Sequence, residues 1–237
     1  MSRKVVFLDG PPGAGKSTVL GHLAAKYKFT VIQEPLVQWS FALTDLEALE
    51  ASICSRKDAG EYLESAELFR DVMKYEFALT HFQTLVLSWY QQLADMLPRT
   101  TFQKSHPPVI VVERSPTSAL VFHQLAVLSD DRTMECAEQL RRIGTQLPSI
   151  SSAHHFNLML SPEEAVVRLN QRRAPGDTRW SVESLQQYYT IFDDIMQSRD
   201  AEIINIDATQ TPEQMAEAIH KQVGVKPPSR SRFDMFF

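Results

Sequence analysis

The nine residues from Gly10 to Thr18, Gly-Pro-Pro-Gly-Ala-Gly-Lys-Ser-Thr, constrain the fold more than any other part of the chain. They follow the apolar run 5–8 and precede a segment with helical periodicity that ends near Tyr27. The spacing Gly-x-x-x-x-Gly-Lys-Ser lets successive backbone N–H groups surround a polyphosphate at the start of a helix, whose dipole also favours anions. The sequence therefore predicts a phosphate-binding loop formed by Gly10, Gly13, Ala14, Gly15, Lys16, Ser17 and Thr18.

Two residues of this loop have defined tasks in such a site. Lys16 is expected to reach the β- and γ-phosphates, and Ser17 to ligate Mg²⁺. A glycine-rich turn of another kind can share the pattern by chance. The strand expected before the loop and the helix expected after it are the context that a phosphate-binding loop requires.

Composition and charge limit the classes of protein that the chain can belong to. With 237 residues, 43% of them hydrophobic and 22% charged, the chain fits one α/β domain with a sizeable core. The net charge of −5 argues against direct nucleic-acid binding, because such proteins normally carry a basic excess. Cys54 and Cys136 are too few for a disulfide framework and lack metal-binding spacing, which favours a reducing compartment.

The sequence also indicates no association with a membrane. No apolar run approaches the roughly 20 residues that a membrane-spanning helix needs, and no signal-like segment precedes the first expected strand. We therefore expect a soluble, unprocessed protein of the cytoplasm. The sequence does not separate a cytosolic from a nuclear or mitochondrial location.

Five short apolar runs are separated by segments with helical patterns. Continuous rather than alternating apolar runs indicate strands that are buried on both faces, as in a parallel sheet. The carboxyl ends of such strands share one rim, where ligands bind in open α/β folds. The expected strands are residues 5–9, 29–33, 109–113, 156–160 and 203–207. The polar residues at their carboxyl ends are Asp9, Glu34, Glu113, Arg114 and Asp207.

A long helical region is expected between the second and third strands. Residues 61–97 contain neither Gly nor Pro, and we expect Gly60 and Pro98 to bound the helix. Gln83 lies beside an apolar stripe, where a buried amide needs hydrogen-bond partners. From the pattern alone, the simpler interpretation is an amide at the edge of the stripe, bonded to water or backbone. The stripe includes Leu79, Phe82, Val86 and Tyr90.

An arginine-rich segment follows the fourth strand. A helix is expected to start at Ser161-Pro162-Glu163-Glu164, which offers an N-cap, a proline at the first helical position and early acids. Residues 174–177 then form a turn, and a second helix covers about 181–198. A basic surface face is the ordinary interpretation of such arginines. The arginines around the turn are Arg168, Arg172, Arg173 and Arg179.

The chain divides into a domain, residues 1–224, and a flexible tail, residues 225–237. Within the tail, residues 230–237 resemble a sliding-clamp-binding peptide, in which a bulky apolar residue precedes paired aromatics, although Arg230 replaces the usual Gln. A weak protein partner for the tail is one interpretation. Docking of the apolar tip on its own domain is the simpler one.

Together, several motifs resemble the deoxynucleoside kinase family, which includes the cellular deoxynucleoside kinases and the herpesviral thymidine kinases. The resemblance runs from Val5 to about Asp207 and rests on the order and spacing of the motifs. It implies a P-loop kinase fold with an arginine-rich lid, ATP and Mg²⁺ as cofactors, 5′-phosphorylation of a deoxynucleoside, and a homodimer. The motifs are Asp9 with the phosphate loop, Glu34-Pro35-Leu36-Val37-Gln38-Trp39, Phe82-Gln83 and Glu113-Arg114-Ser115.

The resemblance assigns a catalytic task to each polar motif. Glu34 would be the general base that takes the proton of the 5′-hydroxyl. Arg114 would hold Glu34 and the reacting oxygens, and Glu113 would help Ser17 to hold Mg²⁺. The lid arginines would close over the γ-phosphoryl group, where negative charge develops in the transition state. These are Arg168, Arg172 and Arg173.

The same resemblance outlines a nucleobase site. Gln83 would form two hydrogen bonds with the edge of the base, as an amide allows. Trp39 and Phe82 would line or stack on the base. His123 stands where relatives carry a second stacking aromatic, so its neighbour Phe122 is expected to share that role.

The sugar contacts are less regular than in the family. Tyr75 is a candidate partner of the 3′-hydroxyl, although its spacing to Gln83 is shorter than in relatives. Asp177 shares that contact and stands where family lids usually have Glu. Ala174 replaces a usual arginine of the lid, and its neighbour Arg173 is expected to compensate.

Two positions bear on the choice of base. Relatives that prefer deoxycytidine or purines pair an Asp with an Arg, and counting the same intervals here gives Ala119 and Tyr90. With Val86, these residues form an apolar wall. A buried amino group without a partner would cost about 1–3 kcal/mol there, whereas a methyl group would gain about 0.8 kcal/mol. Thymidine and deoxyuridine are therefore expected, although the Tyr90 hydroxyl offers a bond that could admit cytosine or a purine.

Two other functions fit parts of the sequence. A nucleoside monophosphate kinase of the thymidylate type shares the fold and lid but needs an Arg near the end of the second strand, where this chain has Ile32-Gln33-Glu34-Pro35. A kinase-like structural subunit without turnover is the other alternative. The presence of Lys16, Ser17, Glu34 and Arg114 argues against the structural subunit. Regulatory GTPases fit poorly, because the chain has no N-K-x-D motif.

Overall fold

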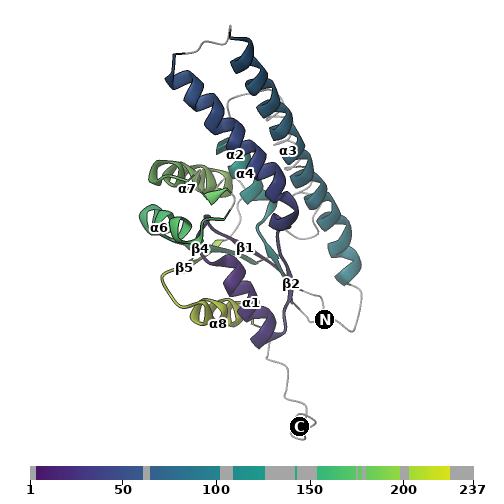
Figure 1. Cartoon of the computed structure of the whole chain (residues 1–237). Coiled ribbons are helices and arrows are strands. Elements are labelled where there is room, and N and C mark those ends of the chain that lie inside the picture. Colours follow the sequence, from purple (N-terminus) through teal and green to yellow (C-terminus); the bar gives the residue numbers. More distant parts are fainter. Residues whose placement is uncertain are drawn as a thin grey trace, which may run out of the picture.

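A five-stranded parallel sheet forms the centre of the molecule (Figure 1). The structure, a computed structural model, describes residues 4–60, 65–101, 109–125, 142, 154–174, 176–177, 180–197 and 203–224. The strand order is β2-β3-β1-β4-β5, and all pairs are parallel. The strands are β1 (Lys4–Asp9), β2 (Thr30–Ile32), β3 (Val109–Glu113), β4 (His154–Met159) and β5 (Ile203–Asp207). The expected α/β fold is confirmed, with β2 one residue shorter at each end than expected.

The central strand β1 has a different helix layer on each face, because successive side chains of a strand point in opposite directions. Val6 and Leu8 belong to the core formed with α1 (Lys16–Tyr27) and α8 (Pro212–Val223). Val5 and Phe7 belong to the core on the other face, formed with α3 (Ala66–Thr101) and α4 (Pro116–Leu125). Burial on both faces explains why β1 and β3 read as uninterrupted apolar runs.

The strand register brings the polar residues of β1 and β3 to one rim. Leu8 of β1 is paired with Glu113 of β3, so Asp9 and Arg114 follow at the same edge. The β2 pairing with β3 ends at Ile32, two residues before Glu34. Glu34 therefore emerges beside the same rim. Asp207, at the end of β5, lies two strands away from β1 and is exposed.

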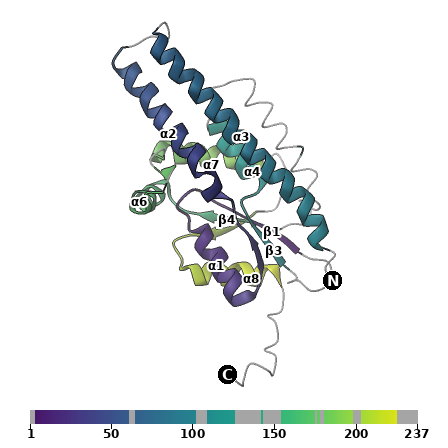
Figure 2. The ribbon, with the colours of Figure 1, turned by 45° about the vertical axis from the view of Figure 1, so that its right-hand side comes forward.

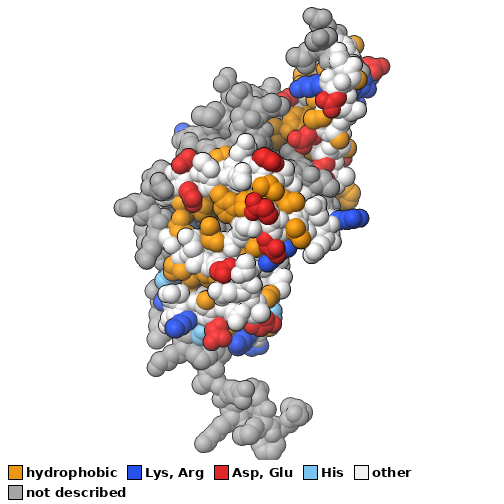
Figure 3. Space-filling view, turned by 90° about the vertical axis from the view of Figure 1, so that its left-hand side faces the viewer, with side chains coloured by type: hydrophobic (Ala, Val, Ile, Leu, Met, Phe, Trp, Pro, Cys, Tyr) orange, Lys and Arg blue, Asp and Glu red, His pale blue; other side chains and the backbone are white. Residues whose placement is uncertain are grey.

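Helices α2 (Leu36–Asp58) and α3 form an antiparallel pair that projects beyond the sheet (Figures 1 and 2). Side chains join them near the projecting end: the Ser52 hydroxyl donates to Asp71 at 2.9 Å, and Arg56 Nε does so at 3.2 Å. Apolar, acidic and basic side chains alternate along this projection in the space-filling view (Figure 3). The far ends of the two helices lie well away from the central sheet (Figures 1 and 2).

The expectation that α3 ends before Pro98 is wrong, because the helix continues to Thr101. A proline inside a helix lacks an N–H and crowds the carbonyl four residues earlier, at a cost of about 3 kcal/mol. Leu93 and Leu97 are almost fully buried in this last part of α3. Their burial contributes about 1.5–3 kcal/mol each, which is enough to offset the proline.

The helices around the arginine-rich segment start and end as expected. Helix α6 (Pro162–Arg172) is capped by the Ser161 hydroxyl, which accepts from the backbone N–H of Glu164 at 3.2 Å. Arg173 ends it in the left-handed conformation, with φ 53°. Helix α7 (Val182–Gln197) is the second expected helix. No helix of the described residues is long and apolar enough to cross a membrane, and the tail, 225–237, lies outside those residues, so its role stays a prediction.

Candidate active site

A cavity of about 770 Å³ opens at the carboxyl ends of β1 and β3. The phosphate loop, α2, α3, the start of α4 and the segment around α6 and α7 line it, so residues far apart in the sequence meet there. Most of the expected site residues are among those that line it: Gly13, Gly15, Lys16, Ser17, Thr18, Glu34, Trp39, Phe82, Gln83, Val86, Glu113, Arg114, Ala119, Arg168, Arg172 and Asp177.

The phosphate loop has the geometry of an anion cradle. Gly13 has φ 82°, and a Cβ atom there would lie 3.1 Å from the carbonyl oxygen of Ala165, so only glycine fits without strain. Gly15 is the N-cap of α1, which begins at Lys16. The N–H groups of the first turn have no partner within the helix, and the residues of that turn, Lys16, Ser17 and Thr18, line the cavity. Ala14 is fully buried behind the loop.

Lys16 is buried and held by the loop itself. Its Nζ donates to the carbonyl oxygens of Gly10 at 3.0 Å and Pro11 at 2.8 Å. Burial and the nearby positive charge of Arg114 lower the pKa of Lys16 to about 7. The amine thus has only neutral carbonyl partners in these hydrogen bonds, and an arriving phosphate would be a stronger one.

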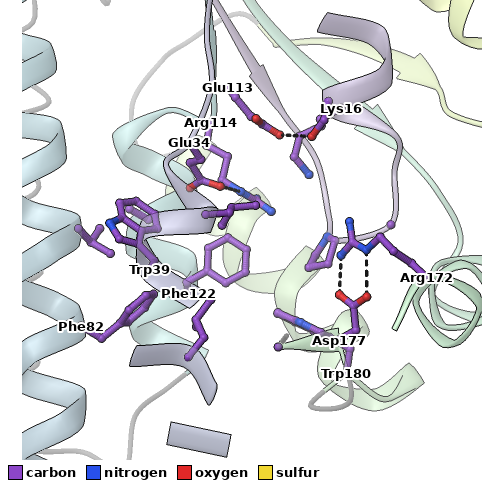
Figure 4. A pocket seen from close by; sticks show the side chains of 18 of the residues that line it. Lys16, Glu34, Trp39, Phe82, Glu113, Arg114, Phe122, Arg172, Asp177 and Trp180 are labelled. Atoms are coloured by element: carbon purple, nitrogen blue, oxygen red, sulfur yellow. Dashed lines mark hydrogen bonds and ion pairs between the residues drawn. The ribbon is translucent and has the colours of Figure 1, made fainter. Parts of the chain in front are cut away.

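Glu34 and Arg114 form a buried ion pair at the centre of the site (Figure 4). Arg114 Nε donates to Glu34 Oε2 at 2.8 Å, and its Nη1 donates to the carbonyl oxygen of Gly10 at 3.1 Å. The guanidinium lies 4.5 Å from the ring centroid of Phe122, a cation–π contact. Burial raises the pKa of Glu34 above its usual value, although Arg114 opposes this shift.

Ser17 and Glu113 meet on the other side of the phosphate loop. The Ser17 hydroxyl donates to Glu113 Oε1 at 3.0 Å, and Glu113 is 3% exposed. A hydroxyl and a carboxylate are the hard oxygen donors that Mg²⁺ prefers, usually together with waters and substrate phosphates. The pair fits a magnesium ion bound mainly through the phosphates. Among the described residues there is no group of three His, Cys, Asp or Glu side chains that could bind a metal ion without such help.

The cavity wall formed by α2 and α3 is mostly apolar, with Gln83 and Glu50 as its polar residues. Gln83 is 6% exposed and lines the cavity, and its Nε2 has no hydrogen-bond partner among the described residues. Trp39 and Phe82 pack edge to face beside it, with ring centroids 5.9 Å apart. A buried donor without a partner is rare in proteins and indicates a missing ligand or water. The interpretation of Gln83 as a surface-edge amide is therefore less favoured by the structure than a ligand-facing one.

The segment between α6 and α7 closes one side of the cavity. Arg172 donates to both oxygens of Asp177, from Nη2 at 2.5 Å and from Nε at 2.9 Å (Figure 4). Arg168 instead pairs with Glu164 at 3.0 Å and with the carbonyl oxygen of Ala208. The backbone N–H of Gly176 donates to Glu47 of α2 at 2.9 Å, which joins this segment to the opposite wall.

Some expected site residues lie elsewhere. Tyr90 is fully buried and donates to the carbonyl oxygen of Ser115 at 3.1 Å; neither it nor Tyr75 is among the residues that line the cavity. Arg173 is exposed and donates to the carbonyl oxygen of Asn170, away from the cavity. The side chains of His123 and Arg179 lie outside the described residues. The substrate contacts expected of Tyr75, Tyr90, Arg173 and His123 stay predictions.

The structure adds cavity residues that the sequence did not single out. Leu43 and Leu46 of α2 continue the helical stripe that begins at Trp39, so periodicity alone was a usable signal. Trp180 lines the cavity and packs edge to face on Phe122 at 5.7 Å between ring centroids. No local pattern relates Trp180 to Phe122, because Phe122 lies in α4 and Trp180 lies in the segment before α7.

The chain is similar to several known proteins. A family model described as deoxynucleoside kinase matches residues 6–226. A thymidine kinase of Saimiriine herpesvirus 1 (strain MV-5-4-PSL) is 25% identical over 190 residues, which cover 73% of this chain. The match covers 50% of that kinase, so the chain spans about half the length of this curated relative.

Solved structures with the same fold include two bacterial proteins. Deoxyadenosine kinase from M. mycoides, determined with dCMP and dCDP bound, superposes with a TM-score of 0.60 at 14% identity, covering 92% of this chain and 98% of its own. The YorR protein of Bacillus subtilis, in complex with phosphorylated GDP, has a TM-score of 0.51 at 19% identity, covering 93% and 95%. At these identities the similarity concerns the fold.

Proposed function

This chain belongs to the deoxynucleoside kinase family, and on that premise we propose that it transfers the γ-phosphoryl group of ATP to the 5′-hydroxyl of a deoxynucleoside. The observation that carries the proposal is the Arg114–Glu34 ion pair, 2.8 Å between Nε and Oε2, in the same cavity as the phosphate loop and the Gln83 amide. A base, a phosphate cradle and a nucleobase contact are the parts that this reaction needs.

In the proposed reaction, Glu34 accepts the proton of the 5′-hydroxyl as that oxygen attacks the γ-phosphorus. The bond between the γ-phosphorus and the bridging oxygen breaks, which releases ADP and leaves the deoxynucleoside monophosphate. Arg114 keeps the carboxylate oriented through its Nε–Oε2 hydrogen bond. Lys16 exchanges the Gly10 and Pro11 carbonyl oxygens for phosphate oxygens. The protein thus contributes position and charge rather than covalent chemistry.

Mg²⁺ would be held by Ser17, with Glu113 ligating directly or through water. When bound, it neutralises charge on the phosphates. The lid arginines act on the same charge from the other side: Arg172 and Arg168 line the cavity, and Arg173 would have to move in to contribute. In this proposal Asp177, which now pairs with Arg172, also contacts the sugar hydroxyl together with Tyr75.

The nucleobase lies between the aromatic side chains and the Gln83 amide, and we propose thymidine and deoxyuridine as favoured substrates. Ala119 and Val86 line this part of the cavity and offer no partner for an exocyclic amino group. The Tyr90 hydroxyl donates to the Ser115 carbonyl oxygen, and Tyr90 is fully buried and does not line the cavity, so we assign it no contact with the base. A methyl group against Ala119 gains about 0.8 kcal/mol, in favour of thymine.

Incubation of the purified protein with labelled ATP and a panel of nucleosides and monophosphates tests the proposal. We expect labelled thymidine and deoxyuridine monophosphates, with lower kcat/KM for deoxycytidine, deoxyadenosine and deoxyguanosine. A purine preference of tenfold, about 1.4 kcal/mol, would overturn the assignment of the base but not of the reaction. Turnover of dTMP without any nucleoside would indicate the thymidylate-type alternative, and no turnover at all the structural-subunit one.

Two further features belong to the same proposal. The enzyme works as a homodimer, and the exposed face of α3 offers a surface for it: Phe69, Met73 and Phe77 recur there at intervals of four residues. We also place the protein in the cytoplasm, because its two cysteines show no disulfide pattern.

A further inference from the structure

Asp9, at the end of β1, is a buried carboxylate that the proposed chemistry does not use. The residue is 1% exposed. Its Oδ1 accepts hydrogen bonds from the backbone N–H of Ser115 at 2.8 Å and from the Ser118 hydroxyl. Its Oδ2 accepts none from the described residues. A half-satisfied buried carboxylate is costly. The start of α4 has a cap of its own, because the Ser115 hydroxyl accepts from the backbone N–H of Ser118 at 3.4 Å, so helix capping does not explain an Asp here.

The turn that Asp9 holds is strained. Arg114 has φ 63°, in the left-handed region that residues other than Gly, Asn and Asp rarely adopt. Its backbone N–H donates to the carbonyl oxygen of Leu8 at 3.0 Å. The next residue, Ser115, is fixed on both sides, because its N–H donates to Asp9 and its carbonyl oxygen accepts from Tyr90. Strained turns persist only where surrounding contacts determine them in this way.

The direction of this turn decides where the Arg114 side chain points. The guanidinium reaches Glu34 at 2.8 Å and, at 3.1 Å, the carbonyl oxygen of Gly10, the residue next to Asp9. A change in the turn would therefore move the guanidinium relative to both partners. Asp9 itself is not among the residues that line the cavity, so it would act on the reaction through the residues that it holds, of which Arg114 is the one that contacts Glu34.

We propose that Asp9 is a positioning residue: its carboxylate holds the Arg114 turn in the conformation that brings the guanidinium to Glu34. The inference rests on the proposed function, because the position of Arg114 affects turnover only if Glu34 is the base. The contact also links the end of β1, from which the phosphate loop continues, to the first turn of α4. Asp9 is thus connected both to the phosphate loop and to the Glu34–Arg114 pair.

The test compares Asp9→Ala and Ser118→Ala with Asp207→Ala. Asp207 is a matched control, because it also ends a strand and accepts from a backbone N–H and a hydroxyl, both of Thr209, at 2.9 and 2.7 Å. It is exposed and does not line the cavity. We expect Asp9→Ala to lower kcat by roughly 10–100-fold, the usual effect of a small misplacement, with the KM for thymidine within about threefold. Ser118→Ala should lower kcat by about three- to tenfold, and Asp207→Ala should leave kcat unchanged.

The pH dependence of kcat/KM distinguishes a positioning role of Asp9 from a purely stabilising one. Arg114 lowers the pKa of Glu34 against the effect of burial, so a displaced guanidinium moves the acid limb of kcat/KM to higher pH. Asp9→Ala should show this shift and Asp207→Ala should not. A lower melting temperature with unchanged kcat and an unchanged acid limb would overturn the proposal. If Asp9→Ala does not fold, Ser118→Ala carries the same test, because it removes only one hydroxyl.

A readout without turnover distinguishes this inference from the proposed function. The Arg114 Nε–H group, assigned by its loss in Arg114→Lys, should exchange slowly with solvent in ¹⁵N NMR spectra of the wild type and Asp207→Ala. It should exchange faster in Asp9→Ala. Unchanged exchange in Asp9→Ala would refute the positioning role, whatever the activity. Faster exchange, with no nucleoside phosphorylated by the wild type, would refute the proposed function and leave the role of Asp9 intact.

Discussion

At the scale of single residues, Glu34 combines a buried position with a charged partner. Burial raises the pKa of its carboxyl group, whereas the guanidinium of Arg114 and the ammonium of Lys16 lower it; the net direction is upward. A general base is most effective when its pKa lies near the working pH, so an upward shift is useful for proton transfer. The same two cations oppose the upward shift and so favour the ionised carboxylate.

We predict that Glu34→Gln leaves ATP binding near normal while lowering kcat by roughly 10²–10⁴-fold. The amide has nearly the same shape and can still accept from Arg114, but it cannot take a proton. Calorimetry gives the ATP affinity and a coupled assay gives kcat. Glu217→Gln, on the exposed surface of α8, is the control and should match the wild type. A retained kcat in Glu34→Gln would remove this residue from the mechanism.

The pH dependence of the wild type provides a second test of Glu34. The base must be ionised, so kcat/KM should fall as the pH drops through a pKa that lies above the usual 4.5. The charged groups that act on the Glu34 pKa are Arg114 and Lys16, which lower it, and Glu113, which raises it. Rates measured at saturating Mg·ATP from about pH 4 to pH 9 locate this limb. An acid limb at or below 4.5, or an identical limb in Glu34→Gln, would contradict the assignment.

The residues of the catalytic pair were predictable because short motifs carry them, whereas parts of the base site were not. Arg114 directly follows β3, and Glu34 lies two residues after the end of β2. The carboxyl ends of these parallel strands meet at one rim of the sheet. Gln83 could be found on a helical stripe, but its unpartnered Nε2 is visible only in three dimensions. Trp180, in the segment before α7, meets Phe122 of α4 only through tertiary packing, for which one sequence has no signal.

At the scale of elements, the segment between α6 and α7 presents its arginines in different ways. Arg172 lines the cavity and is paired with the buried Asp177, and this hydrogen bond raises the pKa of Arg172. Arg173 is the exposed C-cap of α6. The same short segment thus offers one preorganised cation and one that points to solvent.

We predict that Arg172→Ala lowers kcat by at least tenfold more than Arg173→Ala. Arginines that meet a transferring phosphoryl group contribute up to 10³–10⁵ in rate, and only the first of these two is held at the cavity. Single-turnover assays at saturating ATP compare the two variants directly. Equal losses would indicate that the segment rearranges on binding and brings Arg173 in.

Element ends were predictable wherever a cap determines them. Ser161 at the start of α6 and the turn after Arg173 follow local rules that act within four residues. Pro98 is the exception, because the burial of Leu93 and Leu97 outweighs a local helix-breaking signal. Packing of this kind depends on which helix face meets the sheet, and local rules do not include it.

At the scale of the whole molecule, we predict a dimer that forms through the exposed face of α3. Phe69, Met73 and Phe77 are 56%, 52% and 77% exposed on one stripe, which leaves large apolar side chains in water. We predict that wild-type protein has the mass of a dimer in multi-angle light scattering and that Phe77→Glu shifts it toward the monomer. Phe41→Glu, at an equally exposed aromatic of α2, is the matched control. A monomeric wild type would refute the dimer.

The left-handed backbone and the buried charge of Arg114 both cost the protein stability. Arg114→Gly alone removes the strain but leaves Glu34 buried without its partner, which typically costs about 3–5 kcal/mol. Replacing both charges by apolar side chains of similar volume, in Glu34→Leu with Arg114→Met, is often neutral or stabilising by about 1–4 kcal/mol. We expect the double variant to have a melting temperature at or above that of the wild type and no kinase activity. Calorimetry measures the first and the kinase assay the second. A double variant with a melting temperature as low as that of Arg114→Gly would contradict this prediction. A selection for heat resistance alone would therefore favour loss of the reaction at this position, and the charged pair persists only while turnover itself is selected.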